Sequence, residues 1–181
     1  IEQPYGPEKG YHLSKDLADQ AIKMIGDQKS ANPSKPWFMW YCPGANHAPH
    51  QAPADYIAKY KGKFDGGWDE LRAKTLARQI EMGIVPKGTK LAPVDPFIKP
   101  WNTLTPAQKK VYARQMEIYA GFAEHVDDQI SRLHDYIEST GELDNTVFIY
   151  VLGGLSVTSD SAVFSSSQSP RQSNLQTEHL P

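Results

Sequence analysis

The chain has 181 residues, a formal net charge of −2 at pH 7 and a pI near 6.3. That length is typical of one domain, and the balanced charge offers neither a basic face for nucleic acid nor an acidic tail. No apolar run approaches the roughly 18 residues of a membrane span. Hydrophobic residues make up 39% of the chain, so we expect a modest core. The single cysteine, Cys42, excludes an internal disulfide and leaves the cellular compartment open.

The first third of the chain has the pattern of a loop, a helix and a strand. Residues 1–12 are rich in proline and glycine and are expected to form a loop. Ser14 is the expected N-cap of a helix that carries an apolar stripe. The stripe consists of Leu17, Ala21 and Ile25. The aromatic run Trp37–Tyr41 is too short for a helix, so we expect a buried strand.

A loop with two histidines follows this strand. Its sequence from Asn46 to Pro53 is NHAPHQAP, which we call the histidine loop. The two prolines stiffen the backbone that displays His47 and His50. In open α/β sheets, ligands bind at loops that leave the carboxyl ends of strands. From the residues alone, two interpretations remain for the histidines: a transition-metal site or a structural role in the loop.

The rest of the chain predicts a short helical stretch around Ala54–Tyr60, two longer helices and one further strand. Residues 68–82 have the pattern of a helix, and the proline-rich residues 83–102 are irregular. A capping box at Thr105–Gln108 starts a long helix, which Gly141 is expected to end. The β-branched run Val147–Leu152 predicts a second strand. Eight of the 26 residues in 156–181 are serine, which predicts a disordered, low-complexity tail.

The long helix at 106–139 carries a continuous apolar stripe, and two interpretations remain open. The stripe could form the seam of a coiled coil, which would make the chain a non-catalytic, self-associating scaffold. Such a stripe more often packs a helix onto a sheet.

The histidine loop resembles a loop of the type I sulfatases, in particular the bacterial arylsulfatases. In that family a His-x-Pro-x-x-x-Pro loop follows a core strand, and here the motif begins at His47. The segments Tyr56–Trp68, Met116–Leu133 and Gly141–Thr146 are similar to the family as well. The resemblance implies an α/β fold of the alkaline-phosphatase-like type, with helices packed on a mixed sheet. It also implies that His47 contacts the sulfate of a sulfate ester.

The chain departs from the family pattern at its catalytic motifs. The resemblance implies a calcium ion bound by an Asp-Asn-Gly sequence, but this chain has Leu152-Gly153-Gly154 at that place. It also implies a formylglycine formed within C/S-x-P-x-R, which the sequence after Cys42 does not match. We therefore interpret Cys42 as a buried, inert thiol and expect no nucleophile and no metal ligand in this chain.

The sequence thus predicts a partial sulfatase-like α/β domain at 13–155, preceded by the loop at 1–12 and followed by the tail at 156–181. We expect an internal fragment of an arylsulfatase-like sulfuric ester hydrolase, inactive as an isolated chain. Two alternatives remain: the scaffold that uses helix 106–139, and another hydrolase of the alkaline-phosphatase superfamily. Exposed strand edges and apolar helix faces favour self-association.

Overall fold

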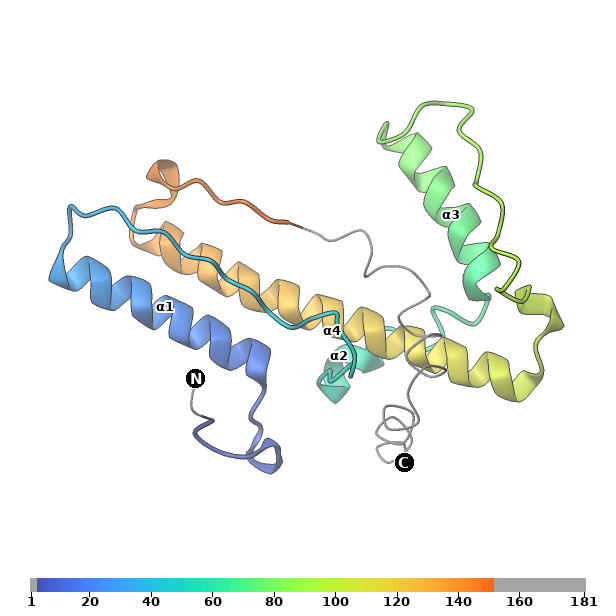
Figure 1. Cartoon of the computed structure of the whole chain (residues 1–181), viewed down its shortest axis with the longest axis horizontal. Coiled ribbons are helices and arrows are strands. Elements are labelled where there is room, and N and C mark those ends of the chain that lie inside the picture. Colours follow the sequence, from blue (N-terminus) through green and yellow to red (C-terminus); the bar gives the residue numbers. More distant parts are fainter. Residues whose placement is uncertain (1–2, 152–181) are drawn as a thin grey trace. The chain divides into compact units, whose positions relative to one another are not determined.

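The structure, a computed structural model, describes residues 3–151, so the tail predicted to be disordered lies outside the described residues (Figure 1). Its helices are α1 (Leu13–Ala31), α2 (Ala54–Ala58), α3 (Gly67–Glu81) and α4 (Pro106–Ser139). Short 3₁₀ helices cover Pro7–Lys9, Trp101–Thr103 and Leu143–Asn145. None of the helices in residues 3–151 is long and apolar enough to cross a membrane.

The chain divides into two compact units that share helix α4. The first unit comprises the described residues up to Pro53 and those from Phe122 onward, and the second comprises Ala54–Gly121. The N-terminal half of helix α4, up to Gly121, therefore belongs to the second unit, and its C-terminal half, from Phe122, belongs to the first. Each unit has its own buried cluster.

Helix α1 is capped by a histidine and not by the predicted serine. The Nδ1 atom of His12 accepts a hydrogen bond from the backbone N–H of Ser14 at 3.2 Å. Ser14 lies inside the first turn and is buried, with 3% of its surface exposed. The prediction of Ser14 as N-cap was wrong because the imidazole of His12, two positions earlier, accepts a backbone N–H of the first turn and starts the helix there.

The core of the first unit lies between α1 and the second half of α4. Ala21 and Ile25 of α1 pack against Leu133 and Ile137 of α4, and all four are at least 96% buried. This pairing uses the apolar stripe predicted for each helix. Full burial of a leucine or isoleucine side chain contributes about 1.5–3 kcal/mol, so Ile25, Leu133 and Ile137 each stabilise the unit by about that amount.

The segment at 37–41 is extended but is not part of a sheet. Trp37, Met39 and Tyr41 pack against the α1–α4 core, whereas Phe38 and Trp40 are 85% and 81% exposed. The alternation has the period of two that is typical of a strand. The prediction of a buried strand is wrong in two respects. No strand forms within residues 3–151, and one face of this segment is exposed.

The segment at 147–151 repeats this arrangement. Val147, Ile149 and Val151 are 77–86% exposed, and Phe148 and Tyr150 are about half as exposed. Phe148 contacts the ring of His134 on α4, with ring centroids 5.9 Å apart. The predicted helices are therefore present in the described residues, but the predicted mixed sheet is not.

Aromatic residues form the core of the second unit. Trp101, Leu104 and Ala113 are buried, and Phe64, Trp68 and Tyr112 pack against them. The ring of Trp101 lies across the start of α3, where a Cβ on Gly67 would come within 2.0 Å of it. Gly67 also has φ of +73°, so the turn into α3 requires glycine for two reasons: a side chain has no space beside Trp101, and the backbone is left-handed. The carboxylate of Asp69 accepts the Trp101 backbone N–H at 2.9 Å and fixes this contact.

Both ends of α4 match the sequence prediction. At its start, the side chain of Gln108 accepts from the Thr105 N–H at 3.0 Å, and the Thr105 hydroxyl oxygen accepts from the Gln108 N–H at 3.3 Å. This is a reciprocal capping box. At its end, Gly141 has φ of +72° and donates to the carbonyl of Glu138, while Glu142 donates to that of Ile137. These two bonds form a Schellman motif, which confirms Gly141 as the predicted stop.

Candidate functional site

The histidine loop leaves the extended segment 37–41 and turns at once. The backbone N–H of His47 donates to the carbonyl of Gly44 at 2.9 Å, which closes the turn before the loop. Cys42, just ahead of the turn, is exposed. The interpretation of Cys42 as a buried thiol was wrong, because the extended segment places alternate residues on its open face.

His47 presents one ring nitrogen to the outside. Its side chain is exposed, and its Nδ1 lies 2.7 Å from the carbonyl oxygen of Ala48. A carbonyl only accepts hydrogen bonds, so Nδ1 carries a proton in this contact. The ring is thereby held by its own loop, with Nε2 at the far side for a ligand.

His50, three residues later, lies in a different environment. It is half-buried, and its ring is 6.4 Å from that of Phe122 on α4. Burial lowers the pKa of the His50 imidazole, and this effect outweighs a hydrogen bond with the Asn46 backbone, which raises the pKa. The neutral ring is therefore favoured. The side chain of His47 is thus exposed to solvent, whereas that of His50 packs against Phe122.

A metal centre at the two histidines is not supported by the geometry. Within residues 3–151, the acidic and histidine ligand atoms that gather within 4.8 Å belong to His134, Asp135 and Glu138 on the surface of α4. Calcium prefers six to eight oxygen ligands, and one imidazole with two exposed carboxylates does not match that preference.

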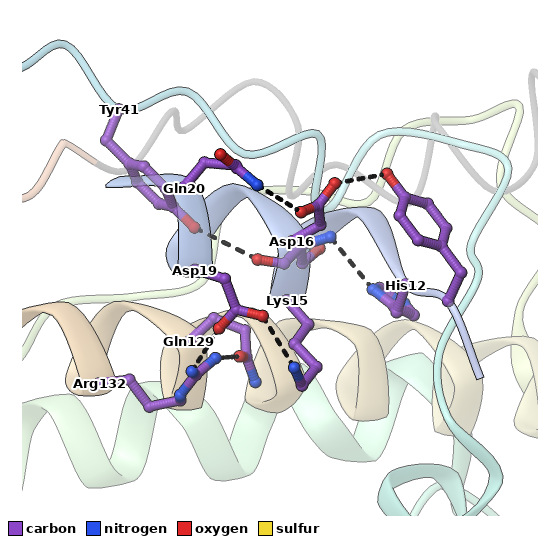
Figure 2. Close-up of polar contacts among 10 residues, drawn as sticks. His12, Lys15, Asp16, Asp19, Gln20, Tyr41, Gln129 and Arg132 are labelled. Carbon is purple, nitrogen blue, oxygen red and sulfur yellow. Dashed lines mark hydrogen bonds and ion pairs between the residues drawn. The ribbon is translucent and has the colours of Figure 1, made fainter. Parts of the chain in front are cut away.

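The loop rests on a frame in which α1 and α4 are joined by a polar network (Figure 2). Arg132 of α4 donates to the carboxylate of Asp19 at 2.5 Å and to the side-chain oxygen of Gln129 at 2.8 Å. Lys15 donates to the other oxygen of Asp19 at 2.8 Å. Burial alone would raise the pKa of Asp19, but these hydrogen bonds outweigh it and hold the pKa below its usual value. The network fixes the register of the two helices relative to one another.

One contact in this region was not expected from the sequence. His12, which caps α1, also lies with Nε2 2.9 Å from the backbone carbonyl of Gln51 in the histidine loop. The two residues are 39 positions apart. The only local signal was a histidine just before a helix start, and a single sequence does not say that its second nitrogen reaches a distant loop.

The chain is similar to known sulfatases over most of its length. The family model described as Sulfatase matches residues 1–153. An uncharacterised sulfatase of Schizosaccharomyces pombe is 38% identical over 144 residues, which are 79% of this chain and 26% of that protein. An arylsulfatase of Klebsiella aerogenes is 32% identical over 123 residues, 68% of this chain and 26% of the relative. An arylsulfatase of Clostridium perfringens is 24% identical over 161 residues, covering 83% of this chain and 28% of its own. The chain thus spans about a quarter of the length of these relatives.

Proposed function

The chain belongs to the sulfatase family, and we propose that its residues serve the hydrolysis of sulfate esters of the aryl sulfate type. In this proposal α1 and α4 form a frame, and the histidine loop supplies a contact to the sulfate group. The resemblance to two arylsulfatases supports this substrate class. The observation that carries the proposal is the geometry of His47, an exposed imidazole held by Ala48 in its own loop.

His47 suits the binding of a sulfuryl oxygen. As an imidazolium it has two N–H donors, one of which is given to the Ala48 carbonyl. The second, on Nε2, would form a charge-assisted hydrogen bond to the anion. The bond to Ala48 fixes the ring plane beforehand, so less side-chain freedom is lost when the anion binds.

The described residues do not fit the calcium ion that the family is expected to use. Near His47 they bring together no group of three histidine, cysteine or carboxylate ligands, whereas a hard cation needs several oxygen ligands. Leu152-Gly153-Gly154 offers no side-chain oxygen, and Cys42 lies outside any C/S-x-P-x-R motif. We therefore route no step through calcium or formylglycine, and we expect the isolated chain not to hydrolyse 4-nitrophenyl sulfate.

An NMR titration tests the role of His47 without requiring turnover. Sodium sulfate is added to the 181-residue chain at constant ionic strength against sodium chloride, below about pH 6 so that exposed imidazoles are protonated. We expect the Nε2 and Hε1 signals of His47 to shift progressively. The signals of His134, whose ring packs on Phe148, serve as the internal control. Equal shifts at both rings would mean a general salt effect and would refute the proposed contact.

Repeating the titration with sodium phosphate in place of sodium sulfate distinguishes a sulfatase from another hydrolase of the alkaline-phosphatase superfamily. A His47 response to phosphate that clearly exceeds the response to sulfate would favour that second class. The third interpretation, a scaffold that dimerises through α4, is disfavoured by the burial of Leu133 and Ile137 against α1. The stripe that would form a coiled coil is already covered within the chain.

Self-association is proposed through the extended segments instead. Phe38 and Trp40 expose large apolar side chains. Within the described residues, no strand pairs with the backbone of this extended segment. Such edges pair readily with other extended chains. We also propose that residues 13–155 form one α/β domain of the sulfatase type once both segments have neighbouring strands.

A further inference from the structure

One side chain connects the start of helix α1 to the histidine loop. The Nδ1 atom of His12 accepts the backbone N–H of Ser14 at 3.2 Å (Figure 2), and its Nε2 lies 2.9 Å from the carbonyl oxygen of Gln51. An N–H only donates and a carbonyl only accepts. His12 is therefore neutral, with its proton on Nε2.

The ring of His12 is also held by packing. It stands edge-on to His125 of α4, with ring centroids 4.2 Å apart, and at 6.2 Å from Phe122. His125 and Phe122 are 4% and 6% exposed, so this support is rigid. Phe122 also faces the ring of His50 in the histidine loop. The loop is thus anchored at two consecutive residues, through the side chain of His50 and the backbone of Gln51.

These anchors lie three and four residues after His47, with Pro49 between them and His47. Proline fixes one backbone angle of this short connection, so the position of Gln51 limits the direction in which His47 points. We propose that His12 is a positioning residue, which holds the Gln51 carbonyl so that His47 presents Nε2 to the sulfate. The inference rests on the proposed function for its purpose, but the hold on the loop is testable by itself.

Two substitutions separate the hold on the loop from the helix cap. In His12→Asn the side-chain oxygen still caps α1, because asparagine is a favoured N-cap, but the shorter side chain does not reach Gln51. In His12→Ala both functions are lost. His134→Asn is the matched control, since it makes the same change on α4 away from the loop.

Backbone ¹⁵N relaxation of the full chain is the decisive measurement. We expect order parameters of the loop amides between 46 and 51 near about 0.85 in the wild type and the control, falling toward about 0.6 in His12→Asn. We also expect ¹⁵N shifts that place the His12 proton on Nε2, and helix content that falls only in His12→Ala. A rigid loop in His12→Asn, or a proton on Nδ1, overturns the inference. An absent sulfate response of His47 in the wild type refutes the proposed function instead, while the loop order parameters still decide the role of His12.

Discussion

The contact between α2 and α4 in the second unit leads to a sharp prediction for Gly121. A Cβ placed on Gly121 would lie 2.9 Å from the backbone nitrogen and 3.0 Å from the Cα of Ile57. Ordinary contacts of a Cβ begin near 3.4 Å. The atoms in the way belong to the backbone of α2, so they cannot rotate aside as a side chain would. Gly121 is therefore present for close approach between two helices.

Two opposing effects decide the result of Gly121→Ala. Alanine favours the helix by about 1 kcal/mol over glycine, and overpacking a tight contact costs about 1–3 kcal/mol. We expect net destabilisation of up to about 2 kcal/mol. The matched control is Gly26→Ala in the interior of α1, where the added Cβ would meet only the hydroxyl end of Tyr136 at 2.7 Å. That side chain can move, so the control should be stabilised by up to about 1 kcal/mol.

Urea unfolding followed by far-UV circular dichroism and tryptophan emission measures both variants. Trp68 and Trp101 report on the second unit, and Trp37 and Trp40 on the first. The midpoints should move in opposite directions with unchanged m-values. Ile57→Ala should not rescue Gly121→Ala, because the clash is with the backbone of Ile57. If Gly121→Ala is stabilised as much as Gly26→Ala, the close approach of α2 and α4 is refuted.

Three further predictions follow from single contacts. Burial lowers the pKa of His50 below its usual 6.5, so the unfolded chain binds that proton more tightly and the free energy of unfolding falls as the pH drops below about 6.5. In urea titrations between about pH 7.5 and 5, His50→Leu should therefore lose less stability than the wild type, and an equal loss would contradict the burial of His50. The double change Phe38→Lys with Trp40→Lys removes the two most exposed side chains of segment 37–41. It should reduce the molecular mass measured by light scattering at high protein concentration, whereas a mass equal to that of the wild type would show that this face does not mediate self-association. Thr105→Ala removes one half of the capping box of α4 and should lower the free energy of unfolding by about 1 kcal/mol. An unchanged midpoint of thermal unfolding would show that the Gln108 side chain alone caps the helix.

The elements that could be predicted from the sequence are those with local causes. The capping box at Thr105 and the stop at Gly141 involve residues at most five apart in the chain. Helix α4 therefore begins and ends where its sequence says, and α3 departs by only one residue from the prediction at 68–82. The cap of α1 was missed because the preference for serine is statistical, while the choice of His12 depends on where its ring packs.

The place of His47 on an exposed loop could be predicted from the sequence, but the contacts that support the loop could not. The motif that begins at His47 lies on a loop with an exposed imidazole, as an anion contact requires. The different environments of His47 and His50 depend on Phe122, which is more than 70 positions away. Contacts of that range leave no periodic signal in one sequence, and the same holds for His12 and Gln51.

The absence of a sheet from residues 3–151 has a physical cause, which the exposure pattern shows. Strand formation requires backbone partners from other segments, whereas a helix satisfies its backbone internally. Segments 37–41 and 147–151 keep the period of two, with Met39 and Phe148 facing helices and Trp40 and Ile149 facing outward. Apolar residues on both faces are typical of strands buried between two layers. Helices α1 and α4 provide one of those layers, so the open faces of these two segments are where neighbouring strands and a second layer would add the most buried apolar area.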